Sequence, residues 1–365
     1  MTLAGHHVER VNRSFVAWPH SSPLLDAVGG FEVHDADEGV FGFVVTELSS
    51  AGRRGVRPSG TYATRASPLP VTPRAYARRM AYPLPRSLSP SKVSSFTDCA
   101  LAFRFSAIDR LPEPPTVAAT RGTLVHAALE RLHVLDPADR TVDAALGCLD
   151  EAAAALRDDP ELAGLDLGDD EAVAFHAEAA DLVRNYFRLE DPSTVHAIGL
   201  ELKVEAEVDG VRLRGIIDRL ELDADGELVV TDYKTGSAPS TQHERKRLSG
   251  VHIYSLLCEQ LLGRRPRTVQ LLYLKAPLAI TTRPTDRSTR GTRRTLGAVW
   301  QAVERACERE DFRPQPSHLC NYCAFQAYCP SFGGDPDEAR RLGEALTRTA
   351  DEPQPPLALA AIPAP

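Results

Sequence analysis

Apolar residues recur every three or four positions through residues 88–189, which is the spacing of one face of an α-helix. Around residue 128 they are Val125, Ala128, Leu129 and Leu132. Ser89 stands before the first apolar stretch, where its hydroxyl can cap free backbone N–H groups. The pattern predicts helices from about 89 to 105, around 124–132, over 141–157 and over 169–189.

The period changes from 3.6 to 2 near residue 196. From Leu200 to Val208 apolar residues alternate with charged ones, which is typical of a half-buried strand. Asp209-Gly210 is a hairpin turn signal. The pattern predicts strands over 200–208, 211–222 and 228–233 joined by tight turns, then a helix over 241–262, a strand over 269–274 and a helix over 296–309.

The two ends of the chain lack such patterning. Residues 1–80 have scattered Gly, Pro and Ser without a persistent period, and the two methionines are Met1 and Met80. We expect 1–80 to be an irregular N-terminal extension and Met80 to be the true start, so that 1–79 have no folded role; a small irregular domain is the alternative. Residues 333–365 are expected to form a largely disordered tail, rich in Pro and Ala from Glu352.

Composition bounds the class of protein. The chain has 365 residues, of which 43% are hydrophobic and 25% charged, as in ordinary globular proteins. We find no apolar run of membrane-spanning length and no signal-peptide pattern, so we expect a cytoplasmic protein without a membrane partner. Seven cysteines, three of them clustered, argue against a secreted disulfide framework.

The net charge of −8 conceals two opposite blocks. Residues 136–191 hold sixteen Asp/Glu and four Lys/Arg, whereas residues 241–300 hold twelve Lys/Arg and three Asp/Glu. Binding to a phosphate backbone depends on the local patch rather than on the total charge. The second block is therefore a candidate nucleic-acid surface, and a solvated basic face is the alternative.

Asp218, Asp232 and Lys234 form a candidate catalytic centre. Asp218 lies in the second predicted strand and the other two end the third, so the tight turn between the strands should make them neighbours. Asp232 and Lys234 share a face because residues i and i+2 of a strand point the same way. Two carboxylates there can hold Mg²⁺ or Mn²⁺, beside a lysine that orients water or offsets phosphate charge. A surface Asp–Lys pair is the alternative.

The segments Gly215-Ile-Ile-Asp218-Arg and Val229-Val-Thr-Asp232-Tyr-Lys234-Thr-Gly resemble the core of the PD-(D/E)XK nuclease superfamily, in particular the RecB-family exonucleases. The resemblance runs from about Leu88 to Phe332 and implies a restriction-endonuclease-like α/β core over 86–332. That core is a mixed central sheet flanked by helices, with a helical insertion and a C-terminal cysteine-rich staple. It also implies that His126 is a metal ligand and that Glu201 adds an acidic group, with Glu205 as its competitor.

One position departs from the family pattern. These nucleases often carry Gln-x-x-x-Tyr on the helix after the lysine, where it contributes to the active site or to DNA binding. Here Tyr254 is present, but Gly250 stands four residues before it. Tyr254 is then either a DNA contact or a core aromatic, and a neighbour such as His252 or Arg247 can take over the role of the glutamine. Arg245 and Arg247 are further candidate DNA contacts.

Cys320-x2-Cys323-x5-Cys329 supplies three thiolates at a spacing suited to a metal centre that needs a fourth. Cys99 resembles the first ligand of the iron–sulfur subfamily, although Ala100 follows it where proline is usual. The resemblance implies a structural [4Fe–4S] cluster held by these four cysteines. Zinc or unliganded thiols are the alternatives, and Cys148, Cys258 and Cys307 are expected to be buried.

The sequence thus favours a Mg²⁺- or Mn²⁺-dependent deoxyribonuclease. The resemblance implies action on single-stranded DNA ends in repair or recombination, with a separate helicase as a possible partner. Two other readings stay open. One is a catalytically weak DNA-end-binding subunit of a helicase–nuclease complex, and the other is a zinc-stapled structural module.

Overall fold

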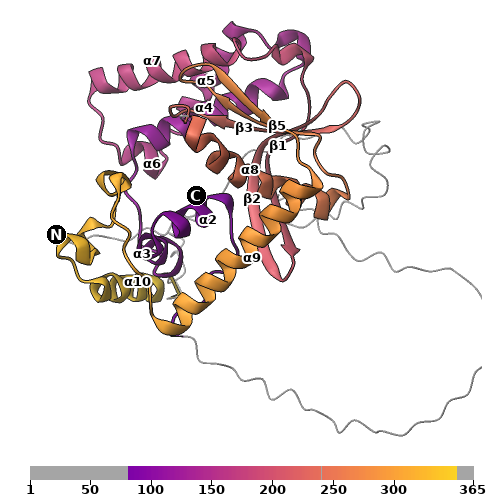
Figure 1. Cartoon of the computed structure of the whole chain (residues 1–365). Coiled ribbons are helices and arrows are strands. Elements are labelled where there is room, and N and C mark those ends of the chain that lie inside the picture. The colour runs from indigo at the N-terminus through magenta and orange to yellow at the C-terminus, as the bar shows by residue number, and fades with distance from the viewer. Residues whose placement is uncertain (1–80, 240, 352–365) are drawn as a thin grey trace, which may run out of the picture.

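A computed structural model describes residues 81–239 and 241–351, except for the side chains of 241–249 and 349–351. A five-stranded sheet in the order β1-β2-β3-β4-β5 lies between two groups of helices (Figure 1). The strands are β1 (His196–Val208), β2 (Val211–Leu222), β3 (Leu228–Lys234), β4 (Thr268–Tyr273) and β5 (Leu278–Thr282).

The sheet is mixed because of one crossover. β1, β2 and β3 form an antiparallel meander, and β4 pairs with β5 in the same antiparallel manner. β3 and β4 are parallel, with α8 (Thr241–Leu262) connecting them. Parallel neighbours require such a long crossover, whereas antiparallel neighbours can be joined by short turns.

One face of the sheet is covered by α4 (Val117–Val134), α5 (Val142–Ala155) and α7 (Asp169–Tyr186). α4 begins after Thr116, whose side chain accepts a hydrogen bond from the backbone N–H of Ala119 at 3.2 Å. The predicted apolar face of α4 is buried: Val125, Leu129 and Leu132 have no exposed surface. Each such burial contributes about 1.5–3 kcal/mol.

The opposite face is covered by α8, α9 (Asp286–Arg309), α2 (Pro90–Asp98) and α3 (Ala100–Phe103). Leu256 and Leu257 of α8 and Val303 of α9 are fully buried there. α3 runs into a π-helical turn, and α10 (Pro336–Asp351) follows a series of short helical turns. These shorter elements are η1 (Arg104–Ile108), η2 (Pro137–Asp139), α6 (Pro160–Ala163), η3 (Pro192–Thr194), η4 (His318–Tyr322), η5 (Gln326–Tyr328) and η6 (Pro330–Phe332).

The predicted α/β class and mixed sheet are confirmed, and the largest differences from the prediction concern four elements. β5 was not predicted, α9 begins ten residues earlier than expected, and α10 occupies 336–351, which we had assigned to a disordered tail. The expected continuous helix from 89 to 105 is interrupted at Cys99, which is extended (φ −161°, ψ 109°). Ser89 does cap α2, accepting from the backbone N–H of Lys92 at 3.2 Å.

The expectations for residues 1–80 and 352–365 lie outside the described residues. In the described part of the chain, none of the helices combines the length and the apolar character needed to cross a membrane.

Candidate active site

Three side chains from three different elements meet at one edge of the β1–β2 pair. His126 comes from α4, Glu201 from β1 and Asp218 from β2, and one ligand atom of each lies within 4.8 Å of the others. Nδ1 of His126 is 3.5 Å from a Glu201 carboxylate oxygen and 3.6 Å from Oδ2 of Asp218. Within the described ranges this is the one His/Cys/Asp/Glu group so closely spaced.

The register of β1 and β2, and an unusual backbone conformation in β1, orient Glu201 and Asp218. Leu200 pairs with Arg219 and Leu202 with Ile217, so Glu201 and Asp218 face each other across the two strands. Glu201 has a left-handed backbone (φ 43°), a conformation that costs a non-glycine residue about 1–3 kcal/mol and often accompanies functional sites.

A glycine brings α4 close to the end of β3. A Cβ atom on Gly122 would lie 3.1 Å from Oγ1 of Thr235, so the helix can approach this closely because position 122 has no side chain. His126 lies one helical turn further on, and the same approach carries its ring to the carboxylates.

The hydrogen bonds of His126 define which ring nitrogen faces the carboxylates. Nε2 lies 3.2 Å from the backbone carbonyl of Tyr233, which can only accept, so Nε2 donates. Nδ1 is left facing two carboxylates. A metal-binding histidine is commonly held in this way, with its second nitrogen donating to a carbonyl.

Asp232 and Lys234 lie beside this group at the end of β3. Their side chains form an ion pair, as expected for residues that share a face of the strand. The residue between them connects the two carboxylates, because the backbone N–H of Tyr233 donates to Oδ2 of Asp218 at 2.7 Å. Asp232 is buried, whereas 39% of the Lys234 side chain is exposed.

The electrostatics of the centre favour a bound cation. Burial and then the nearby Asp232 raise the pKa of Asp218 to about 7. Burial opposes the charge on His126, but Glu201 and Asp218 outweigh it and raise the pKa of the imidazole to about 9. Burial also opposes the charge on Lys234, and Asp232 reverses the effect and raises its pKa. Clustered carboxylates of this kind are stabilised by any cation that approaches them.

A family model described as the PD-(D/E)XK nuclease superfamily matches residues 87–330. The chain belongs to that superfamily. PD-(D/E)XK nucleases use divalent metals, and the imidazole nitrogen and two carboxylates of the group above are a donor set suited to such an ion.

Two phage proteins are similar in sequence to this superfamily member. Gene 69 protein of Mycobacterium phage D29 is 26% identical over 271 residues, which cover 67% of this chain and 96% of the phage protein. Gene 69 protein of Mycobacterium phage L5 is 29% identical over 136 residues, covering 36% of this chain and 44% of the phage protein.

Two solved structures match with low sequence identity. One is from Eubacterium rectale and is named as a proposed exonuclease; it has a TM-score of 0.41, is 12% identical, and covers 72% of this chain and 93% of its own. The other, SSO0001, has a TM-score of 0.29, is 13% identical, and covers 67% of this chain and 86% of its own.

The remaining candidates of the nuclease centre fall into three groups. Glu205 is exposed and pairs with Arg212 at 3.4 Å, so of the two competing glutamates only Glu201 reaches the group. Tyr254 belongs to the hydrophobic core, and its pKa is raised by burial and then by Asp232, Asp218 and Glu201. The side chains of Arg245 and Arg247 lie outside the described residues.

Gly215 allows Tyr254 to take this position. A Cβ atom on Gly215 would lie 2.8 Å from Cε1 of Tyr254, so a larger residue in β2 would displace the ring. In contrast, a Cβ on Gly250 would have no neighbour within 4 Å. The position that departs from the family pattern therefore faces open space.

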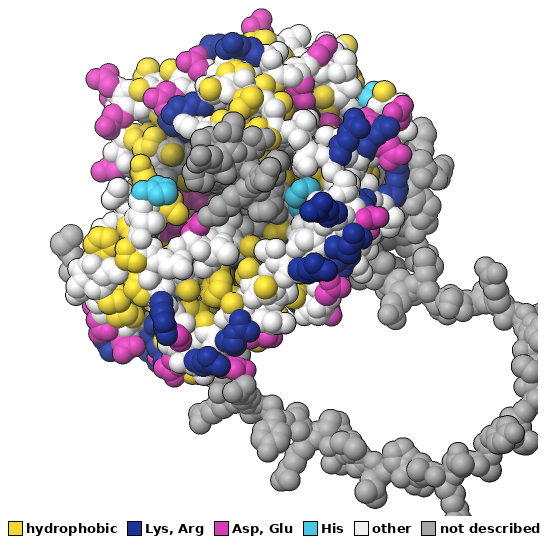
Figure 2. All heavy atoms as spheres, in the orientation of Figure 1, with side chains coloured by type: hydrophobic (Ala, Val, Ile, Leu, Met, Phe, Trp, Pro, Cys, Tyr) yellow, Lys and Arg dark blue, Asp and Glu magenta, His cyan; other side chains and the backbone are white. Residues whose placement is uncertain are grey.

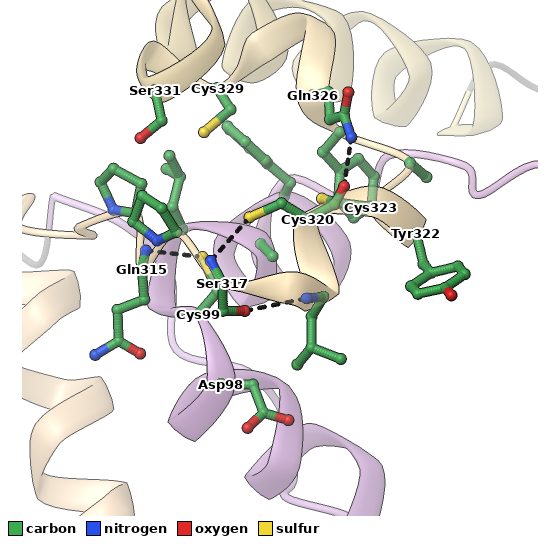
Figure 3. A pocket seen from close by; sticks show the side chains of 18 of the residues that line it. Asp98, Cys99, Gln315, Ser317, Cys320, Tyr322, Cys323, Gln326, Cys329 and Ser331 are labelled. Carbon is green, nitrogen blue, oxygen red and sulfur yellow. Dashed lines mark hydrogen bonds between the residues drawn. The ribbon is translucent and has the colours of Figure 1, made fainter. Parts of the chain in front are cut away.

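The four predicted cysteine ligands line one cavity of about 220 Å³ (Figure 3). Cys99 enters from the break between α2 and α3, and Cys320, Cys323 and Cys329 enter from the loop after α9. Backbone N–H groups already point at two of the sulfurs: Gln315 donates to Cys99 at 3.5 Å and Ser317 to Cys320 at 3.3 Å. The other cysteines are buried elsewhere, as expected: Cys148, Cys258 and Cys307.

The sequence analysis missed a buried ionic network directly behind the active site. Arg219 follows Asp218 in β2, points to the other side and has no exposed surface. Its guanidinium pairs with Glu190 and donates to the hydroxyl of Tyr233 at 2.8 Å, while Nε lies 2.6 Å from Glu221. The network therefore fixes the side chain of Tyr233, and the backbone N–H of Tyr233 in turn donates to Asp218. The sequence signal for it was an arginine within a strand that is otherwise rich in apolar residues, with Glu221 two positions further on.

Proposed function

We propose that this PD-(D/E)XK superfamily member is a divalent-metal-dependent deoxyribonuclease that hydrolyses phosphodiester bonds at single-stranded DNA ends. The observation that carries the proposal is the convergence of His126, Glu201 and Asp218 beside the Asp232–Lys234 pair. The three ligand atoms lie within 4.8 Å of one another, and the partly exposed lysine stands at the margin of the group.

Each residue has a role that follows from its place. Asp218 and Asp232 hold Mg²⁺ or Mn²⁺, and His126 and Glu201 complete the ligand set. A bound divalent ion offsets the negative charge that develops on the phosphate during displacement. Lys234, fixed by Asp232, orients the attacking water or contributes a second positive charge to the phosphate. Tyr254 is buried in the core against Gly215 of β2, so it supports the strand that carries Asp218 rather than contacting DNA.

The choice of DNA ends, and a place in repair or recombination, rests on resemblance to RecB-family exonucleases. A helicase partner has the same basis. The two phage relatives carry no functional description that bears on this choice.

The test is cleavage of end-labelled single- and double-stranded DNA with Mn²⁺ by wild type and by Asp232→Ala and Lys234→Ala. Asp225→Ala and Arg267→Ala are charge-matched controls, because these two residues form an ion pair at the opposite end of β3 from Lys234. We expect each active-site variant to lose at least about 100-fold in rate. The product ladder gives the polarity of digestion.

Two results would overturn the proposal. Cleavage that survives in both active-site variants would mean that the centre lies elsewhere. DNA binding without cleavage by metal-loaded wild type would favour the DNA-end-binding subunit instead.

We also propose that Cys99, Cys320, Cys323 and Cys329 hold a [4Fe–4S] cluster with a structural role. Four thiolates are the usual ligand set of such a cluster, and N–H groups directed at the sulfurs are among the features that tune it. Tetrahedral zinc at about 2.3 Å from each sulfur would bring the sulfurs to within about 4 Å of one another. No three cysteine sulfurs of the described residues are within 4.8 Å of one another, which favours the larger group.

Anaerobic purification followed by iron and zinc analysis and visible absorbance tests this second proposal. We expect a brown protein that loses its colour and iron in Cys329→Ser but keeps both in the control Cys148→Ala, which alters a buried thiol on α5. A colourless protein with one equivalent of zinc would establish the zinc alternative, and a metal-free protein would establish unliganded thiols.

A further inference from the structure

Among the described arginines of the basic block 241–300, some pair with carboxylates of the protein and others do not. Arg264 lies 3.5 Å from Glu227, and Arg265 lies 2.7 Å from Asp286. Arg267 pairs with Asp223 at 3.2 Å. These three arginines stabilise loop and helix ends, and their charge is offset within the protein.

The exposed face of α9 behaves differently. Arg287, Arg290 and Arg294 are spaced three and four residues apart, so they lie on one face of the helix, and all three are exposed. Gln301 and Arg305 continue the same face toward the C-terminal end. We call these residues the α9 stripe. It is opposite the buried face of the helix, which contains Leu296, Val299, Val303 and Ala306.

No carboxylate of the described residues pairs with an arginine of the α9 stripe within 4.0 Å, in contrast to Arg293 on the same helix. Arg293 lies 3.2 Å from Asp209 and 3.8 Å from Glu259, and so is anchored to the β1–β2 turn and to α8. Like charges three or four residues apart on a helix repel each other by about 0.2–0.5 kcal/mol per pair. An anion from outside the described protein would remove that repulsion.

The length and chemistry of the α9 stripe fit a nucleic-acid backbone. From Arg287 to Arg305 the helix rises about 27 Å at 1.5 Å per residue. That length corresponds to about eight phosphates along one strand of duplex DNA. Every charged group of the α9 stripe is a guanidinium, whose fork of donors matches phosphate oxygens. Figure 2 shows basic side chains gathered along the course of α9.

We propose that the α9 stripe binds the DNA phosphate backbone outside the catalytic centre and holds the strand while its end is cleaved. This inference rests on the proposed function for its choice of DNA as the ligand. The α9 stripe belongs to a helix that packs on α8, the helix that carries Tyr254. α9 also contacts β2, the strand that carries Asp218.

The experiment compares two triple variants with the same change of net charge. Arg287→Gln/Arg290→Gln/Arg294→Gln alters the α9 stripe. The control is Arg157→Gln/Arg184→Gln/Arg188→Gln, which removes three exposed arginines from the acidic helical region around α7. Binding to labelled oligothymidylate and to a duplex, each of about 30 residues per strand, is measured by fluorescence anisotropy in EDTA over a range of salt concentrations. Unfolding midpoints establish that both triples are folded.

We expect the dependence of log K on log salt to become shallower in the α9 triple. Three lost phosphate contacts reduce the slope by about 2 for a single strand or about 2.7 for a duplex. At about 0.1 M salt the change for a single strand corresponds to a loss of about 100-fold in affinity. A DNA form that lies on the α9 stripe should show its full expected change, about 2 for a single strand or about 2.7 for a duplex, whereas a form that does not lie there should keep its slope. The control triple should retain the wild-type slope.

An unchanged slope in the α9 triple would overturn the inference, and so would an equal change in both triples, because net charge alone would then explain it. Binding is measured without metal, so these outcomes are separate from the nuclease test. If wild type fails to cleave DNA while only the α9 triple loses slope, the proposed reaction fails and the backbone contact stands. If wild type cleaves and the α9 triple keeps the slope, the reaction stands and the inference fails.

Discussion

A metal ion that binds Nδ1 of His126 has to displace a proton. In the metal-free protein the carboxylates of Glu201 and Asp218 raise the pKa of His126 to about 9. At pH 7, two units below that value, removing the proton costs about 2.7 kcal/mol, so the apparent affinity should be about 100-fold lower than for the fully deprotonated imidazole. One quarter of the side chain is exposed, and solvent screening makes 100-fold the upper end of the range.

The perturbation is His126→Gln, and the assay is Mn²⁺ binding followed by electron paramagnetic resonance between pH 7.5 and pH 9. Asp218, whose pKa is raised to about 7, is already ionised in most molecules in this range, so His126 dominates the change. In wild type we expect the logarithm of the association constant to rise by nearly one per pH unit.

The variant removes the titrating group, so its affinity should vary little with pH. The His126 charge that the carboxylates stabilise has the opposite effect on the metal-free fold: its stabilising contribution is complete below about pH 6.5 and is lost as the pH rises through about 9. A steep pH dependence that persists in His126→Gln, or a flat dependence in wild type, would refute the assignment of His126 as a ligand.

Three further variants test the packing around the site, each by urea unfolding. Gly215→Ala places a Cβ 2.8 Å from the ring of Tyr254 and should reduce the free energy of unfolding by about 1–3 kcal/mol. The control Gly147→Ala has open space around it and should not destabilise the protein, and equal effects of the two variants would contradict the close contact. Tyr233→Phe removes a hydroxyl that accepts from Arg219 at 2.8 Å and should cost about 1–3 kcal/mol, against no loss for Tyr322→Phe, which is 86% exposed. Leu129→Ala empties part of the core between α4 and the neighbouring helices and should reduce the free energy of unfolding by about 2–5 kcal/mol. The control Val173→Ala lies on the surface and should lose much less, and an equal loss would show that burial is not the cause.

Elements with a strong hydrophobic period were predictable from the sequence. The alternation of 200–208 and the turn at Asp209-Gly210 give β1 and β2 nearly as they are found, and the apolar face of α4 places His126 on a helix. β5 was not predicted because only Ile280 of its five residues is buried, which leaves no alternating apolar pattern. The first half of α9 was not predicted because its residues are mostly polar, and the start of the helix depends on the Thr285 cap.

Features that depend on residues far apart in the sequence could not be predicted from the hydrophobic pattern. Glu201 and Glu205 are equivalent by strand alternation, and only the β1–β2 pairing and the position of α4 distinguish them. The interruption at Cys99 has no local breaker residue. It is found where the chain meets the cysteine loop more than two hundred residues later, a contact that no local propensity encodes.

The buried guanidinium of Arg219 has a consequence for how this chain can vary in length. Its principal carboxylate partner, Glu190, stands just after α7, in the helical region inserted ahead of the sheet. Deleting that region would remove the carboxylate that pairs with both terminal nitrogens of Arg219 and leave Glu221 as the remaining carboxylate beside this buried charge, which would destabilise the fold. The helical region is thus not a removable appendage. Shortening it, or grafting it onto a related scaffold, requires that the segment from Tyr186 to Glu190 be carried along or that Arg219 be exchanged at the same time.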